Sequence, residues 1–198
     1  MANHGYVKTK KFLSPAKINA LLEELNRDVF KGCLKFEYED CRGQDNAWGD
    51  DVWIVTYDGD AEQNEKYVKV WTNYWKKGNF VRVFWLNTRR TLEIRHGGGG
   101  DFCWWVDAVI RHEVAHKFNG VIEDDAGDWR ENPQPDRYRN IADYLDARSE
   151  WFKGDTEESH NLRRAAVKHM MLEMSPPEFW EEIEKFEAPE IEFPSRIE

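Results

Sequence analysis

The feature that most constrains the fold is the pattern His-Glu-x-x-His at His112, Glu113 and His116, in a run without Gly or Pro between Gly100 and Gly120. Such a run predicts a helix that ends at the turn residue Gly120. Residues four apart lie on the same face of a helix, so the two imidazoles would point the same way. This arrangement is typical of a site in which two neutral histidines hold one Zn²⁺. Two core or surface histidines without a metal are the alternative.

Glu113 is turned about 100° from His112 on the expected helix and would stand beside the metal. From there it could accept a proton from a water that the metal activates and pass it to a leaving amine. We therefore expect Glu113 to be the catalytic residue. Trp105 and Val109 share one stripe of the helix with the two histidines. We expect this stripe to be buried, because a metal site needs a shielded histidine face.

Length and charge limit the class of protein. The chain has 198 residues, a formal net charge of -10 and a pI near 5.2. A chain of this length can form one domain with a real core. An acidic chain is poorly suited to gripping nucleic acid, which needs a basic surface. We therefore expect a protein or peptide partner and no nucleic acid.

The cysteines and the apolar runs bear on the compartment. Cys33, Cys41 and Cys103 form no Cys-x-x-Cys pair, which predicts neither a zinc ribbon nor a disulfide framework. No apolar run approaches the ~18 residues that cross a membrane, and the N-terminus has no apolar signal core. We expect a cytoplasmic protein, with a virion-associated protein as the alternative. Ten Trp, clustered in apparent strands, indicate core packing or a surface for a protein partner.

The spacing of apolar residues predicts an α+β fold. Besides the motif helix, helical spacing covers 15–30, 138–152, 160–174 and 178–186. Alternating or apolar runs predict strands at 34–38, 52–57, 67–71, 80–86 and 91–95. Turn residues separate these runs, so we expect a mostly antiparallel or mixed sheet of four or five strands. We divide the chain into a loose arm at 1–13, a single domain at 14–187 and an extended tail at 188–198.

Four glycines at 97–100 come just before the motif helix. They indicate a flexible hinge, and beside a metal cleft such a segment could admit substrate or act as a lid. A phosphate-binding loop is disfavoured, because no Lys-Ser/Thr follows. We expect His96, which precedes the glycines, to lie at the surface. One of the preceding strands, 80–86 or 91–95, could bind an extended substrate by strand addition at a sheet edge.

A catalytic zinc usually has three protein ligands, so the motif predicts one more. His160 is our first candidate, because it begins a helix after a Ser and would suit the lip of a cleft. Glu158 is its neighbour and could serve instead. An acidic loop soon after the motif offers further candidates, and a helix near the C-terminus offers another. These alternatives are Glu123, Asp124, Asp125 and His169; for His169, a packed histidine is the more usual interpretation.

The segment 109–116, Val-Ile-Arg-His-Glu-Val-Ala-His, resembles the signature of the zincin metallopeptidases. Two further segments are similar to the SprT-like branch of that group, namely 25–34 and Ala-Trp-Gly at 47–49. That branch takes its third ligand from a His in a His-Gly-x-x-Phe setting. The nearest counterpart here is His160, which is followed by neither the Gly nor the Phe. The spacing from His116 to His160 is longer than in the family, so we interpret 121–156 as an insertion.

The resemblance implies a zincin-like α+β domain and a zinc-dependent peptidase that hydrolyses peptide bonds. It implies that His112, His116 and His160 hold the metal and that Glu113 is the general base. SprT-like peptidases often act on proteins bound to DNA. The alternative is a structural or partner-binding protein on a zincin scaffold, with a metal site that is not catalytic. In that case the Trp-rich strands and the acidic segments would contact a partner.

Overall fold

The computed structural model describes residues 3–43, 50–58, 79–86, 89–96, 100–123, 129–130, 133–150 and 156–193. In these ranges antiparallel strands form one seven-stranded sheet in the order β2-β3-β4-β5-β1-β6-β7. The strands are β1 (Asn3–Thr9), β2 (Leu34–Asp40), β3 (Asp51–Tyr57), β4 (Asn79–Leu86), β5 (Thr91–His96), β6 (Gly120–Glu123) and β7 (Trp129–Arg130). The helices are α1 (Pro15–Asp28), α3 (Gly100–Lys117), α4 (Pro135–Arg139), α5 (Ile141–Glu150), α6 (Glu157–Met174) and α7 (Trp180–Glu184), with the 3-10 turn η2 (Pro177–Phe179) before α7. The fold is therefore α+β, as the apolar spacing predicts.

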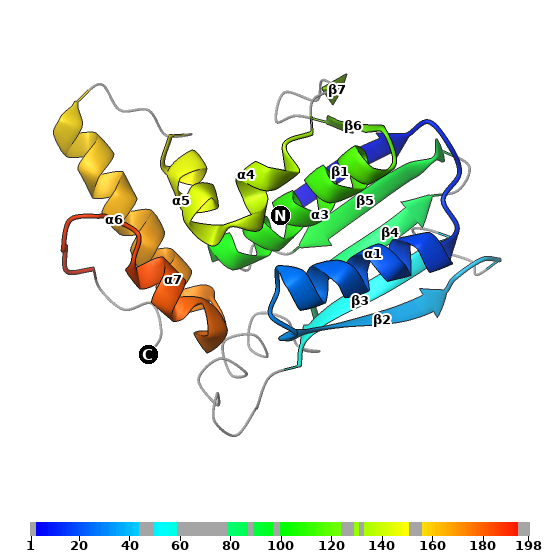
Figure 1. Cartoon of the computed structure of the whole chain (residues 1–198), viewed down its shortest axis with the longest axis horizontal. Helices are drawn as coiled ribbons and strands as arrows, with labels where there is room; N and C mark the ends of the chain where they lie inside the picture. Colours follow the sequence, from blue (N-terminus) through cyan, green and yellow to red (C-terminus); the bar gives the residue numbers. More distant parts are fainter. Residues whose placement is uncertain are drawn as a thin grey trace.

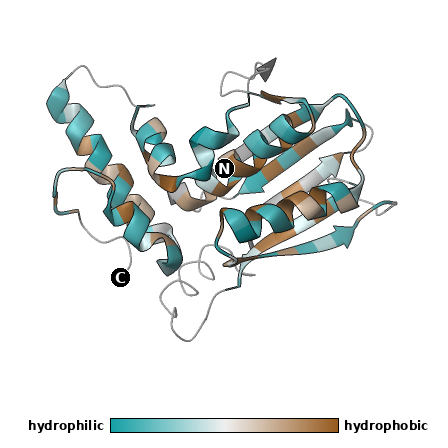
Figure 2. Ribbon diagram, viewed as in Figure 1, coloured by the Kyte–Doolittle hydropathy of each residue, from teal (hydrophilic) through white to brown (hydrophobic). Residues whose placement is uncertain are grey.

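One face of the sheet carries the core. The strand register aligns apolar side chains in rows that cross several strands, and the central residues of two such rows are fully buried: Trp53, Val83 and Ile94, then Trp85, Leu92 and Val7. Helices α1 and α3 lie across this face (Figure 1). Figure 2 shows hydrophobic residues gathered where these helices meet the strands. Apolar burial between the two layers is thus the main source of stability.

Helix α1 begins where the sequence predicts, with Pro15 at its first position after Ser14. Proline suits this position because the first N–H groups of a helix have no partner inside the helix. Ile18, Leu21 and Leu25 are buried at helical spacing. They pack with the sheet and α3 in one apolar cluster. The helix therefore closes the core over the β2–β3 end of the sheet.

The prediction of a loose arm at 1–13 is wrong for 3–9, because these residues form β1 in the middle of the sheet. β1 pairs with β5 on one side and with β6 on the other. Val7 and Thr9 are buried while Lys8 is exposed. This alternation is that of a strand with one buried face. The sheet consequently has more strands than the four or five that the local patterns predict.

The expected edge position of the strands before α3 is also wrong. β4 lies between β3 and β5, and β5 lies between β4 and β1. Both strands have their backbone groups paired on either side, so neither can accept an extended peptide by strand addition. The predicted strand at 67–71 lies outside the described residues.

The predicted helix at 138–152 is divided in two, with 151–152 outside the described residues. α4 ends at Arg139, and Asn140 has extended backbone with φ -93° and ψ 126°. The Oδ1 of Asn140 accepts a hydrogen bond of 2.8 Å from the N–H of Ala142. Asn caps a new helix in this way, so the chain turns and α5 begins at once.

The sequence predicts neither disulfide bonds nor a membrane-spanning helix. None of the three cysteines forms a disulfide bond, which confirms that the chain has no disulfide framework. In the ranges that the structure describes, no helix has the length and apolar character needed to cross a bilayer.

Candidate functional site

Helix α3 carries the His-Glu-x-x-His pattern, and exposure rises along the stripe that holds the two histidines. Trp105 and Val109 are 1% exposed, His112 is half-buried and His116 is exposed. The helix confirms that the two histidines lie one turn apart on one face. The expectation that the whole stripe is buried is wrong for His116. The last turn of α3 still packs in the core through Val114 and Ala115, and His116 lies on the face of this turn that points away from them.

Glu113 is buried, and its carboxylate is held by α4. Its side chain is 4% exposed, and Arg139 donates from Nε to Oε1 of Glu113. This hydrogen bond and the negative charge of Glu113 raise the pKa of Arg139. The Arg139 side chain is 43% exposed, so the pair connects a buried charge to the surface. The residue expected to be the general base is therefore an ion-pair partner in this arrangement.

His112 is also in contact with the segment that contains α4. The backbone N–H of Gln134 donates to Nδ1 of His112 at 2.9 Å. The ring of Tyr138 stacks on the imidazole, with centroids 4.2 Å apart and planes inclined by 25°. Burial, followed by the positive charge of Arg111, lowers the pKa of His112 to about 3. The imidazole is thus neutral at physiological pH, which is the state that binds a metal.

A contact from the core side of α3 also fixes the position of α4. The indole Nε1 of buried Trp105 donates to the backbone carbonyl of Tyr138 at 2.8 Å. Trp105 belongs to the same stripe as His112, two turns earlier on α3. One face of α3 therefore attaches α4 to the core through Trp105 and contacts it again at the motif.

The donor set fits a zinc ion in part. Two imidazoles one turn apart, one of them held neutral by burial, suit a zinc site. A neutral imidazole has one donor and one acceptor nitrogen, so the Gln134 contact puts the proton of His112 on Nε2. Neither nitrogen of His112 then offers a free lone pair. In the described part of the chain, no three His, Cys, Asp or Glu side chains come close enough to hold a metal.

The predicted third ligand is not brought to the pair. His160 and Glu158 lie in the first turn of α6, on the opposite side of the molecule from the C-terminal end of α3 (Figure 1). Glu123 ends β6, and it too belongs to no group of three within the described ranges. Asp124 and Asp125 lie outside those ranges.

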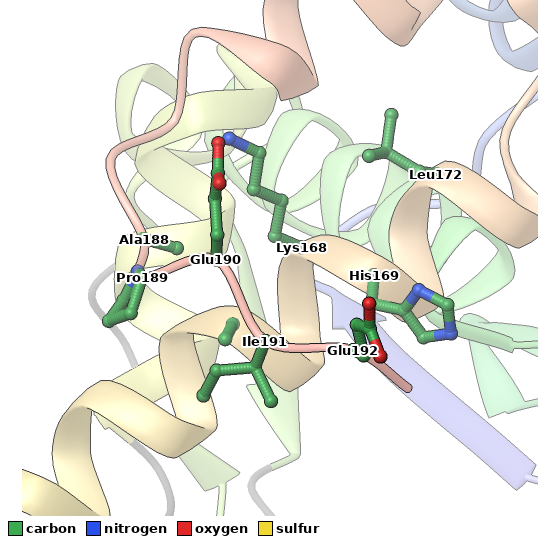
Figure 3. A pocket seen from close by; sticks show the side chains of 9 residues that line it. Lys168, His169, Leu172, Ala188, Pro189, Glu190, Ile191 and Glu192 are labelled. Atoms are coloured by element: carbon green, nitrogen blue, oxygen red, sulfur yellow. The ribbon is translucent and has the colours of Figure 1, made fainter. Parts of the chain in front are cut away.

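His169 has the environment of a packed histidine. Its ring stacks on Phe193 at 5.0 Å between centroids, and its Nε2 lies 3.4 Å from Oε1 of Glu173. The residue lines a hollow of about 460 Å³ between α6 and the tail, together with Lys168, Glu190 and Ile191 (Figure 3). None of the residues that line this hollow belongs to the motif.

His96 is buried, contrary to the expectation of a surface position. It is 2% exposed, its Nε2 lies 3.7 Å from Oδ2 of Asp107, and its ring meets Trp104 edge-on at 4.5 Å. Arg111 donates from Nε to the other carboxylate oxygen of Asp107 at 2.9 Å. His96 ends β5 on the face that α3 covers, which explains its burial. The glycines at 97–99 lie outside the described residues.

Sequence reasoning did not identify Gln134, Tyr138 or Arg139 as neighbours of the motif. The two Pro residues beside Gln134 indicate only a loop, and Tyr138 was expected simply to begin a helix. An Arg in an exposed helix carries no signal that its partner is a buried Glu. Only the docking of α4 on α3 brings these groups together.

Comparison of the chain with protein-family models, with curated proteins and with solved structures finds no match.

Proposed function

We propose that the chain is a zinc-dependent peptidase of the zincin type that hydrolyses peptide bonds in a protein or peptide substrate. The observation that carries the proposal is the arrangement on α3: His112 and His116 share one face, and Glu113 lies on the adjacent face, next to His112 in the sequence. A neutral, half-buried His112 and an exposed His116 are the residues that would hold the metal. Zinc, when bound, polarises a carbonyl and makes a water molecule more acidic.

The chain's own residues have separate roles in this proposal. Glu113 accepts the proton of the attacking water and later donates it to the leaving amine. For that role its carboxylate must be free to face substrate, while in the described arrangement it is bound to Arg139. The third ligand remains the prediction made for His160. Helix α6 already packs against α3, so this role requires the first turn of α6, which carries His160, to move to the C-terminal part of α3. A cytoplasmic location is part of the same proposal.

Two measurements on the purified chain test the proposal. Elemental analysis should find zinc in a ratio of about one per chain. Cleavage of an unstructured protein should stop on Glu113→Gln, because the amide cannot accept the proton, while zinc content stays the same. Equal cleavage by this variant, or the absence of zinc binding under all conditions, would end the assignment.

A second candidate is a partner-binding protein on the same scaffold, and a specific observation favours it. The Glu113–Arg139 ion pair and the Gln134–His112 hydrogen bond give the motif a structural role without metal. In this case Glu113 and His112, which a peptidase would use for catalysis and metal binding, would instead hold α3 and the α4 segment together. Zinc-independent thermal stability, combined with no cleavage by any variant, would favour this candidate.

A further inference from the structure

We infer that residues 133–140, the segment that contains α4, form an autoinhibitory cover. The contacts of this segment with the motif keep the proposed site inactive. The inference rests on the proposed function, because it states how the same site is regulated. Three different contacts of the segment reach the motif: a backbone N–H, an aromatic ring and a guanidinium. Each engages a group that the proposed chemistry needs. The segment lies in 121–156, the part interpreted as an insertion.

The contact at Glu113 withholds the base. The carboxylate is buried, and its Oε1 accepts from Arg139. A hydrogen bond between two charged groups is stronger than one between neutral groups. While it persists, the carboxylate is directed toward α4 and its negative charge is balanced. Arg139 must leave before Glu113 can accept a proton from a water molecule.

The contact at His112 withholds a ligand. The Nδ1 lone pair accepts from Gln134, so the ring proton is on Nε2. A zinc ion could replace the Gln134 N–H at Nδ1, or it could bind Nε2 after the proton moves to Nδ1. Both routes break the Gln134 hydrogen bond. Zinc and the segment therefore compete for the same imidazole.

The contact with Tyr138 covers the imidazole, and Trp105 holds the cover in place. Tyr138 stacks on one face of the His112 ring. Its backbone carbonyl accepts from Trp105, which is buried and cannot follow a moving segment. Opening therefore costs an ordered hydrogen bond and an aromatic contact in addition to the ion pair. This cost is what zinc or a substrate must offset.

The backbone N–H of Gln134 reports directly on the cover. Its neighbours Pro133 and Pro135 have no amide hydrogen, so its signal stands alone in that part of the chain. Selective ¹⁵N labelling of Gln gives backbone signals from Gln44, Gln63 and Gln134 only. Hydrogen exchange is followed on the full chain without metal, with Zn²⁺ and with Mg²⁺. We expect Gln134 to be protected without zinc and to exchange at least about tenfold faster with zinc, but not with magnesium.

Zinc affinity of release variants provides the second measurement. Arg139→Gln removes the charge that holds Glu113, and Tyr138→Ala removes the stacked ring. Each should raise the zinc affinity by about tenfold, the effect of losing one charged hydrogen bond or one aromatic contact. Arg137→Gln is the matched control, since Arg137 is exposed and its charge also acts on His112. It should change the affinity by less than about threefold.

The outcomes separate the cover from the proposed function. Faster exchange of Gln134 with zinc, or zinc binding by the release variants alone, supports the cover. Zinc binding that depends on His112 but leaves Gln134 protected overturns the cover and leaves the peptidase proposal intact. If neither the natural chain nor a folded release variant binds zinc, both are overturned. Circular dichroism of each variant establishes that it is folded.

Discussion

Gly5 of β1 lies directly against the carboxylate of Asp107 on α3. A Cβ added at Gly5 would come within 2.5 Å of Oδ1 of Asp107 and within 2.6 Å of the Arg111 side chain. Asp107 is fully buried and Arg111 is bound to it. The absence of a side chain at Gly5 therefore lets the Asp107–Arg111 ion pair pack against the central strand, directly before the motif.

Gly5→Ala should lower the free energy of unfolding by about 1–3 kcal/mol, the usual cost of an extra methyl group in a packed core. The methyl group would push Asp107 or Arg111 out of a geometry that the core holds. Urea denaturation measures the effect. Lys8→Ala, at an exposed position of the same strand, should stay within about 0.5 kcal/mol. Equal stabilities for the Gly5→Ala variant and the natural chain would contradict the packing described.

The sequence predicts the structure best where that structure depends on residues close to one another in the chain. The Gly- and Pro-free run predicts α3, and Ser14-Pro15 predicts the start of α1; both are confirmed. β1 was missed because its buried positions are Gly5, Val7 and Thr9, of which only Val7 is strongly apolar. Its place between β5 and β6 depends on pairing with distant segments, which no local pattern records.

The candidate site could be predicted only in part, for a similar reason. The spacing of His112 and His116 follows from helix geometry alone. The burial of His96 depends on which face of β5 meets α3, and the Arg139–Glu113 pair depends on how α4 docks. Charges in exposed helices can pair with many partners, so their partner cannot be inferred from the chain order.

The Glu113–Arg139 pair should contribute measurably to stability. Arg139→Ala leaves a buried carboxylate without its partner, and we expect a loss of about 2 kcal/mol, below the value for fully buried pairs because Arg139 is partly exposed. Glu113→Gln with Arg139→Ala should lose less than the sum of the two single changes, with a coupling near 1 kcal/mol. Chemical denaturation of the four proteins measures this. Strict additivity would mean that the pair does not interact in solution.

Tyr38 gives a prediction at alkaline pH. Its hydroxyl donates to Oδ1 of Asp51 at 2.6 Å, and this hydrogen bond, together with a partial loss of hydration, raises the pKa of Tyr38 to about 12. Because the folded pKa lies above the unfolded value near 10, the stabilisation is complete below pH 10 and is lost as the pH rises toward 12. The stability difference between the natural chain and Tyr38→Phe should therefore be constant up to about pH 10 and then shrink. Ionisation of Tyr38 near pH 10, seen as a difference in ultraviolet absorbance between the two proteins, would contradict this.

Substitution of single histidines can identify the residues that hold zinc. Ala at His112 or His116 should lower zinc affinity by at least about 100-fold, since losing a direct ligand costs more than losing an outer partner. His169→Ala is the matched control, because His169 already contacts Phe193 and Glu173. This change should leave the affinity within about twofold. The proposed function takes His160 as the third ligand, although the described arrangement does not group it with the pair, so His160→Ala should lower zinc affinity as much as the other two changes. An affinity equal to that of His169→Ala would show that the first turn of α6 stays away from the motif when zinc binds and that His160 is not a ligand. Competition with a coloured chelator measures all four affinities on one scale.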